Sequence, residues 1–456
     1  MPSADLVILG GGSGGYACAL RASELGMSVI LIDKDKLGGT CLHRGCIPTK
    51  ALLHAAEIAD SSRESAHFGV NTTLHGIDMV KVNEYRDGVV GRLYKGLQGL
   101  FKSRNVTYVE GDGRLVSPNT VEVNGEQYTG TNVVLATGSY ARSLPGLDID
   151  GRIMTSDQAL NLDYVPKSAI VLGGGVIGVE FASVWRSFGA QVTIIEALPN
   201  LVPNEDIACS KALERAYRKR GINLSLGVRF ASATQSDTGV QVALEDGKTF
   251  DADILLVAVG RGPNASGMGF EEQGIAMERG WVLVDERLRT NVPNVFAVGD
   301  ITPGLQLAHR GFQHGIFVAE EIAGLNPVVI PDINIPKVTY CEPEVASVGL
   351  NEAEARALHG DANVTAYEYN LGGNGKSQIL GTAGFIKLVQ VKDGPVVGVH
   401  MVGSRVGEQI GEAQLIVNWE AHPEDVATLI HAHPTQNEAM GEAHLALAGK
   451  PLHAHA

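Results

Sequence analysis

The chain has few cysteines for its length, five among 456 residues. So few cannot form the disulfide framework of a small secreted protein. Cys18, Cys209 and Cys341 stand alone in the sequence, and each is expected to be a small buried residue. Cys41 and Cys46 lie close together in the stretch GGTCLHRGCIPTK. This pair therefore needs a separate explanation.

Aromatic residues, positive charge and long apolar runs are also scarce. Aromatics make up 5% of the residues, and the formal net charge is −15. Such a charge disfavours non-specific binding to nucleic acid and to anionic membranes. Apolar runs stay below the roughly twenty residues that cross a bilayer. The N-terminus, MPSADLVILGGG, enters an apolar stretch without the features of a secretory signal or transit peptide, so a cytoplasmic protein is the simplest interpretation.

Glycine, by contrast, is abundant, with 56 residues, and it is concentrated in recognisable patterns. Gly10, Gly12 and Gly15 match G-x-G-x-x-G directly after an apolar run, and Asp33 ends the next apolar run. Glycines at these positions let a pyrophosphate approach the backbone at a helix N-terminus, and the acid suits ribose hydroxyls. This combination predicts a dinucleotide site within a strand–helix–strand unit.

The same pattern recurs over residues 168–196. Gly173, Gly175 and Gly178 follow a second apolar run, and Glu196 ends the next one. Two copies predict two bound nucleotides and electron transfer between them. Glu196 would repel a 2′-phosphate, which favours NAD over NADP.

The cysteine pair has three interpretations. A zinc site normally needs a second pair of ligands, and here only His43 lies between Cys41 and Cys46. A structural disulfide is unusual in a cytosolic protein. A redox-active pair is the interpretation that the two nucleotide sites favour.

The spacing of the pair also constrains the backbone. In an ideal helix, Cα atoms five positions apart are roughly 8–9 Å from each other, beyond the ~7 Å limit for a disulfide. The segment must therefore leave regular helix, and Gly45 can supply the irregular backbone. Pro48 suits a first helical turn. Cys46 would then lie near a helix N-terminus, which favours a thiolate.

The stretch HAHPTQNE near the C-terminus contains a further candidate. Two histidines in an HxH pattern are usually structural, and no third ligand for a metal is evident, so no metal site is predicted. Glu438 follows His433 by five residues, after the rigid His433–Pro434 step. A carboxylate on one ring nitrogen fixes the tautomer and raises the basicity of the other, which prepares a proton-transfer histidine. His431 is the weaker candidate.

These motifs, in this order, resemble the pyridine nucleotide–disulfide oxidoreductases. The resemblance rests on GGGSGGY, GGTCLHRGCIPTK, ATGS, GGGVIGVE, VGRGPN, NVFAVGD and HAHPTQNE and covers residue 5 to about residue 445. It implies an α/β fold with two Rossmann-like dinucleotide-binding domains, for FAD and NAD, and a C-terminal α+β dimerisation domain. The implied boundaries are 1–142 for the first part of the FAD-binding domain, 143–262 for the NAD-binding domain, 263–335 for the second, central FAD part and 336–456 for the interface domain.

The resemblance also assigns roles to residues. Cys41 would exchange with the substrate, Cys46 would lie against the flavin, and His433 with Glu438 would serve the active site of the other subunit of a homodimer. Lys50 and Glu180 match a pair near the flavin. The residues implied to bind FAD are Gly10, Gly12, Gly15, Asp33, Lys50, Gly138, Asp300, Ala308 and His309, and those implied for NAD are Gly173, Gly175, Gly178, Glu180, Glu196 and Gly260.

Two positions depart from the family pattern. Asp33 stands where glutamate is commoner, a shortening that keeps the charge, and His43-Arg44 replaces the more usual Asn-Val. Because of His43 and Arg44, the family pattern does not predict how polar the surroundings of the cysteines are. The cysteine pair itself matches the family.

Within the family, the resemblance is closest to the branch that oxidises protein-bound dihydrolipoamide to lipoamide with NAD⁺. The implied partner is the lipoyl domain of a 2-oxo-acid dehydrogenase acyltransferase or of the glycine cleavage H protein, with no nucleic acid and no membrane. A related disulfide reductase such as mycothione reductase is the nearest alternative. A non-catalytic FAD-binding scaffold subunit is another, which the intact Cys41, Cys46, His433 and Glu438 disfavour.

Overall fold

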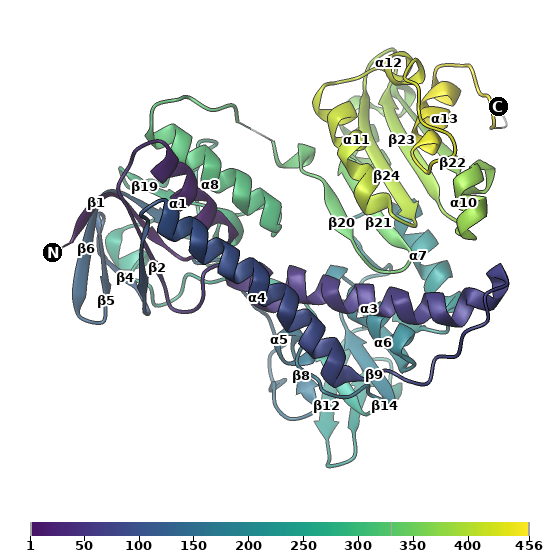
Figure 1. Ribbon diagram of the computed structural model, residues 1–456, viewed down its shortest axis with the longest axis horizontal. Coiled ribbons are helices and arrows are strands. Elements are labelled where there is room, and N and C mark those ends of the chain that lie inside the picture. Colours follow the sequence, from purple (N-terminus) through teal and green to yellow (C-terminus); the bar gives the residue numbers. More distant parts are fainter. Residues whose placement is uncertain (1, 330, 455–456) are drawn as a thin grey trace.

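The structure, a computed structural model, describes residues 2–329 and 331–454. Its main sheets lie in separate parts of the molecule (Figure 1). The sheet that begins with the N-terminal strand is at the left of the view, a second sheet is below it to the right, and the C-terminal part forms a third at the upper right.

The first sheet has the strand order β3-β2-β1-β6-β5-β4, with β19 beside β6. Strands β3, β2, β1, β6 and β19 run parallel to one another, whereas β5 pairs antiparallel with both β4 and β6. The strands are β1 (Ser3–Leu9), β2 (Val29–Asp33), β3 (Thr107–Glu110), β4 (Arg114–Ser117), β5 (Thr120–Val123), β6 (Glu126–Leu135) and β19 (Val295–Ala297). Because β19 comes from a distant stretch of chain, this sheet is built from two separate segments.

Strand β1 is apolar at successive positions because both faces of the first sheet are buried. Leu6 and Ile8 face the cluster that includes helices α1 (Ser13–Glu24) and α8 (Ala308–Ile322), and Val7 faces the opposite cluster. The two helices approach each other so closely that a Cβ at Gly315 would lie only 2.2 Å from the carbonyl oxygen of Gly14.

The second sheet repeats this arrangement with the order β11-β10-β9-β15-β8, all parallel. A smaller antiparallel sheet, β12-β13-β14, extends from it. The elements are β8 (Ile153–Met154), α5 (Ser156–Ala159), β9 (Ser168–Leu172), α6 (Val176–Phe188), β10 (Gln191–Glu196), α7 (Ile207–Lys219), β11 (Asn223–Leu226), β12 (Phe230–Gln235), β13 (Val240–Leu244), β14 (Thr249–Ala252) and β15 (Ile254–Val257).

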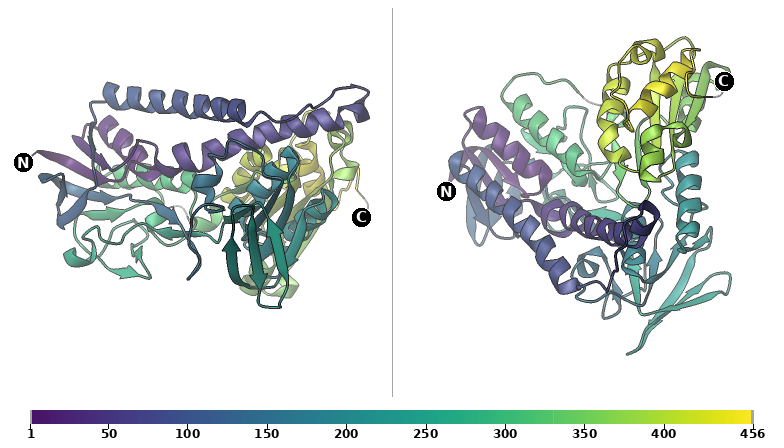
Figure 2. Two further views of the ribbon diagram at one scale, coloured as in Figure 1. Left: turned by 90° about the horizontal axis from the view of Figure 1, so that it is seen from below. Right: turned by 45° about the vertical axis from the view of Figure 1, so that its right-hand side comes forward.

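Three helices lie between β2 and β3 of the first sheet along the chain. They are α2 (Gly39–Arg44), α3 (Cys46–Glu64) and α4 (Met79–Ser103). Helix α3 packs against both α4 and α6, and Figure 2 shows α3 and α4 side by side along one side of the molecule. Among the described residues, no helix is long and apolar enough to cross a membrane.

The third sheet is antiparallel throughout, with the order β20-β21-β24-β23-β22. Its core is formed with α11 and α13. The elements are β20 (Lys337–Thr339), β21 (Glu344–Gly349), α9 (Glu352–His359), β22 (Val364–Asn370), α10 (Gly375–Leu380), β23 (Phe385–Val391), β24 (Val396–Gly403), α11 (Val406–Asn418), α12 (Pro423–Ala427) and α13 (Glu438–Leu447).

Short strands and single helical turns complete the chain. Strand β7 (Ser139–Ala141) pairs with β16 (Arg261–Pro263) where the chain passes between the first two sheets, and β17 (Met277–Glu278) pairs with β18 (Trp281–Val282). The implied domain boundaries at 142, 262 and 335 stay a prediction.

Candidate functional site

The segment that carries the cysteine pair is interrupted between the two residues. Helix α2 ends at Arg44 and α3 begins at Cys46, while Gly45 between them has φ −143° and ψ −108°, far from helical values. The backbone therefore leaves regular helix where the spacing of the cysteines requires it. Pro48 lies in the first turn of α3, where its missing N–H leaves no intrahelical bond unmade.

The two cysteines are free thiols in contact with each other. The hydrogen bond from Cys41, helped by the charge of Lys50, lowers the pKa of Cys46 to about 7 against the opposing effect of burial. The same hydrogen bond and burial raise the pKa of Cys41. Near neutral pH the first proton therefore leaves Cys46, the cysteine at the N-terminus of α3.

An ion pair with a buried carboxylate lies next to Cys46. The Nζ atom of Lys50, on α3, is 2.9 Å from both carboxylate oxygens of Glu180, on α6, and Glu180 is 3% exposed. The backbone N–H of Tyr340 donates to Glu180 at 3.0 Å, and Lys50 lies over the Tyr340 ring. Burial would lower the pKa of Lys50, but Glu180 and Cys46 outweigh it and raise that pKa. A fixed positive charge thus stays beside the thiol.

These groups share a cavity of about 1280 Å³ between the first two sheets and the start of the third. A site for one drug-sized molecule is roughly 300–1,000 Å³, so this cavity exceeds the space that one such ligand takes. The sequence-predicted residues that line it are Gly10, Gly12, Asp33, Cys41, Cys46, Lys50, Gly138, Gly173, Gly175, Glu180, Glu196, Gly260, Asp300, Ala308 and His309.

The first glycine pattern forms a cradle at one end of the cavity. A Cβ at Gly15 would lie 1.8 Å from the carbonyl oxygen of Gly10, so α1 lies directly against the end of β1. Gly12 precedes α1 and has open space where a Cβ would be. The Asp33 carboxylate accepts a hydrogen bond from the backbone N–H of Gly11. This geometry fits a dinucleotide, with room for a pyrophosphate at the helix N-terminus.

The second pattern forms an equivalent cradle on the second sheet. A Cβ at Gly178 would lie 1.9 Å from the carbonyl oxygen of Gly173. The Glu196 carboxylate accepts hydrogen bonds from the N–H of Gly174 at 2.6 Å and from that of Leu198 at 2.8 Å. Its negative charge at the end of β10 disfavours a ligand with a 2′-phosphate, in agreement with the preference for NAD.

The remaining predicted flavin contacts come from the segment around β19 and α8. Ser139 donates to Asp300 at 2.6 Å, which fixes that carboxylate at the cavity wall. Ala308 is the first residue of α8, so this helix also begins at the cavity. The ring of His309 is held by the carbonyl oxygen of Pro336 at 2.7 Å.

The histidine pair of HAHPTQNE lies apart from the residues that line this cavity. His433 Nδ1 is 2.7 Å from Glu438 Oε1, and the His433 side chain is 78% exposed. The other Glu438 oxygen accepts from the N–H of Thr435. His431 is instead 13% exposed and 2.8 Å from Glu412, which raises the pKa of His431. His433 is thus the histidine that is free to meet another molecule.

The two residues that depart from the family pattern make contacts with neighbouring segments. His43 Nε2 lies 2.8 Å from the carbonyl oxygen of Leu37, and its ring packs edge-on against Tyr94 of α4. Arg44 forms an ion pair with Asp35 at 3.2 Å and also lines the cavity. Both side chains therefore connect α2 to the surrounding chain.

Sequence reasoning missed several cavity residues. Lys337 and Tyr340, at either end of β20, and Arg229, just before β12, line the cavity without belonging to any recognised motif. Nothing local in the sequence marks them. The packing of the third sheet against the second brings Lys337 and Tyr340 to the cavity. Histidine, cysteine and acidic side chains between residues 2 and 454, with 330 left aside, form no group of three or more that could hold a metal ion.

The two cradles, the thiol pair and the Lys50–Glu180 ion pair define a class of protein, a disulfide oxidoreductase that uses two dinucleotides. A family model described as pyridine nucleotide-disulphide oxidoreductase matches residues 4–315, and the dimerisation domain of that family matches residues 335–444. The chain therefore belongs to this family of enzymes, flavoproteins that use FAD and NAD. The dimerisation domain supports a homodimer.

Individual relatives narrow the comparison. The chain is 41% identical to a dihydrolipoyl dehydrogenase of Bacillus subtilis over 470 residues, which cover 98% of this chain and 99% of that protein. It is 38% identical to the mitochondrial dihydrolipoyl dehydrogenase 1 of Arabidopsis thaliana, and the match covers 98% of this chain and 91% of that protein. Among solved structures, LpdA from Mycobacterium tuberculosis superposes with a TM-score of 0.91 at 27% identity, covering 98% of this chain and 100% of that one.

Proposed function

We propose that the protein oxidises protein-bound dihydrolipoamide to lipoamide with NAD⁺ as the electron acceptor. The observation that carries this proposal is the Cys41–Cys46 pair beside the Lys50–Glu180 ion pair, in one cavity with two dinucleotide cradles. Full-length relatives named dihydrolipoyl dehydrogenase support the choice of substrate. Glu196 supports NAD⁺ as the acceptor.

The thiol chemistry begins with the pair in its disulfide form. One substrate thiolate attacks the Cys41 sulfur, the disulfide bond breaks, and Cys46 leaves as a thiolate. The second substrate thiolate then attacks the substrate sulfur bound to Cys41, which releases lipoamide and a Cys41 thiolate that takes up a proton. The substrate dithiol is oxidised by two electrons and the enzyme pair is reduced by two. The positive charge of Lys50, which lowers the pKa of Cys46, would stabilise Cys46 as the leaving thiolate.

The chain's other residues hold the redox partners and the charge. Bound FAD supplies the two-electron relay between the thiols and the nicotinamide. In the first cradle, Gly10, Gly12 and Asp33 would hold that cofactor. In the second cradle, Gly173, Gly175 and Glu196 would hold NAD⁺. Lys50 keeps a positive charge beside the Cys46 thiolate.

His433 would act as the base that takes the substrate thiol proton. Glu438 fixes its tautomer, leaving Nε2 for the proton. Since His433 is separated from the cavity of its own chain, a second copy has to supply it, in keeping with the dimerisation domain. The partner in this proposal is a lipoyl domain, which carries its substrate on a flexible arm to the dimer.

A cytoplasmic location is part of the same proposal. Cys18, Cys209 and Cys341 are buried free thiols in the structure, a usage typical of reducing compartments.

The test is NADH formation from dihydrolipoamide and NAD⁺ by the FAD-loaded dimer. The Cys46→Ser variant should lose this activity and keep FAD. The matched control is Cys341→Ser, a buried cysteine whose hydrogen bond to the Pro343 carbonyl a serine hydroxyl can keep, and it should retain activity. Wild-type activity in Cys46→Ser would refute the role of the disulfide.

Two further measurements separate the alternatives. Titration of thiols before and after reduction by NADH should show a gain of two, and no gain would favour the non-catalytic scaffold. Rates with NADH should exceed those with NADPH, and the reverse order would favour a related reductase such as mycothione reductase.

A further inference from the structure

The segment between β10 and α7, residues 197–206, forms part of the wall of the second cradle. Leu198, Pro203 and Glu205 of this 197–206 loop line the cavity next to Glu196. Val202 has φ +41°, a conformation that β-branched residues rarely adopt. Such a conformation persists only where surrounding contacts over-determine it.

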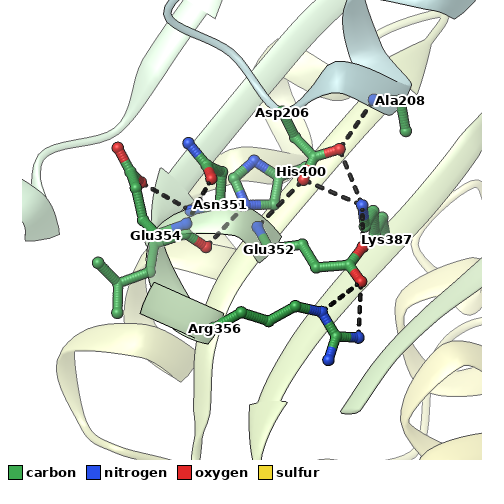
Figure 3. A network of polar contacts seen from close by, with 9 residues as sticks. Asp206, Ala208, Asn351, Glu352, Glu354, Arg356, Lys387 and His400 are labelled. Carbon is green, nitrogen blue, oxygen red and sulfur yellow. Dashed lines mark hydrogen bonds and ion pairs between the residues drawn. The ribbon is translucent and has the colours of Figure 1, made fainter. Parts of the chain in front are cut away.

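The third sheet supplies contacts at the end of the 197–206 loop (Figure 3). Lys387, on β23, places Nζ 2.9 and 3.0 Å from the two carboxylate oxygens of Asp206, the last residue of the loop. Asp206 is 2% exposed and Lys387 is 8% exposed. The same carboxylate accepts hydrogen bonds from the N–H groups of Ala208, on α7, and Glu352, on α9. Asp206 thus joins the second sheet's helix to the third sheet.

The two residues before Asp206 are held from the same side. Glu205 is in hydrogen-bond contact with the hydroxyl of Ser347, on β21, and lies 3.6 Å from Lys337 Nζ. Lys337 also donates to the carbonyl oxygen of Asn204 at 3.2 Å. Every residue from 204 to 206 is therefore tied to the dimerisation domain.

Buried charge of this kind is weak evidence for a purely stabilising role, because well-packed apolar residues of similar volume often stabilise a protein at least as well. An ion pair with two matched oxygen contacts instead fixes a position. Here the fixed position is the point where the 197–206 loop ends and α7 begins.

We infer that Lys387 is a positioning residue for the nicotinamide dinucleotide, holding the 197–206 loop against the second cradle through Asp206. Lys387 itself lies outside the cavity lining, whereas the loop it holds is part of that lining. The dimerisation domain would in this way set the affinity of the NAD site. This inference rests on the proposed use of the second cradle for NAD.

The test compares Lys387→Met with the wild-type FAD-loaded dimer. The readouts are the KM for NADH in electron transfer to ferricyanide and the inhibition constant of ADP-ribose, a redox-inert ligand of the same cradle. Both should rise about three- to thirtyfold, the range expected for residues that act on a site through others. The kcat at saturating NADH, the KM for dihydrolipoamide and the FAD content should stay at wild-type values.

Two further variants make the result decisive. Arg356→Gln is the matched control, since Arg356 contacts Glu352 in the same network but not the loop, and it should leave both constants unchanged. Asp206→Asn keeps a helix-capping side chain and removes the charge, so it should raise the same constants even if Lys387→Met fails to fold. The double variant should be less than additive.

Wild-type NADH and ADP-ribose constants in a folded Lys387→Met or in Asp206→Asn would overturn the inference. Equal losses for NADH and dihydrolipoamide would also overturn it, because they would indicate general damage. Electron transfer from NADH to ferricyanide requires no lipoamide, so failure of the proposed substrate assignment would be seen separately.

Discussion

The low pKa of Cys46 depends chiefly on the thiol of Cys41, and that dependence can be measured. Replacing Cys41 with alanine removes the hydrogen-bond donor, whereas replacing it with serine keeps a donor at the same place. The two variants differ by one oxygen atom. We expect the alanine variant to raise the pKa of Cys46 and the serine variant to leave it closer to that of the wild type.

The magnitude follows from the structure. Lowering the pKa of Cys46 from 9.0 to about 7 corresponds to about 3 kcal/mol of thiolate stabilisation, at about 1.36 kcal/mol for each tenfold change. A hydrogen bond to a charged group contributes about 1.5–3 kcal/mol. Its loss in Cys41→Ala should therefore bring the pKa of Cys46 to about 8–9, with Lys50 opposing a larger rise.

The assay is the rate of alkylation of Cys46 by iodoacetamide in the reduced holoenzyme, followed by mass spectrometry of its peptide from about pH 5 to pH 10. At neutral pH Cys46 of the Cys41→Ala variant should react about tenfold more slowly than Cys46 of the wild type. At high pH, where Cys46 is ionised in both proteins, the two rates should converge. A Cys46 in Cys41→Ala that still titrates at about 7 would refute the reasoning. The pKa would then be set by Lys50 and the helix N-terminus.

Three other perturbations have defined outcomes. Lys50→Met leaves the Glu180 carboxylate, 3% exposed, without its cation, so guanidinium unfolding should show a loss of about 3–5 kcal/mol; an unchanged midpoint would contradict the ion-pair assignment. His433→Gln should slow dihydrolipoamide oxidation about 10²–10⁴-fold, Glu438→Gln should slow it less, and both should keep electron transfer from NADH to ferricyanide, whereas loss of that transfer would place His433 elsewhere in the reaction. Gly178→Ala, whose Cβ would meet a carbonyl oxygen at 1.9 Å, should abolish ADP-ribose binding and retain FAD; normal ADP-ribose binding would exclude the close helix–strand approach.

Much of the site was predictable because its parts are local. Each cradle follows from glycines and a terminal acid within its own strand–helix–strand unit. Only a residue without a Cβ fits there between the helix and the end of the strand. The break at Gly45 follows from the spacing of the two cysteines, because a disulfide cannot span five residues of regular helix. The His433–Glu438 contact is local as well.

The tertiary structure decided what depends on packing between distant segments. It joins β19 to the first sheet, brings Lys50 and Glu180 together from α3 and α6, and carries Tyr340 to their ion pair. It also separates His433 from the cavity of its own chain and ties the 197–206 loop to Lys387.

The division has a physical reason. Backbone sterics and short-range hydrogen bonds act between residues close in sequence, so the amino-acid order by itself determined the two nucleotide cradles, the helix break and the histidine–glutamate pair. A buried charge, by contrast, needs a partner at about 3 Å, and only the packing of whole sheets and helices determines which distant residue stands there. The tertiary structure therefore decided which charges stand around the thiols and behind the 197–206 loop.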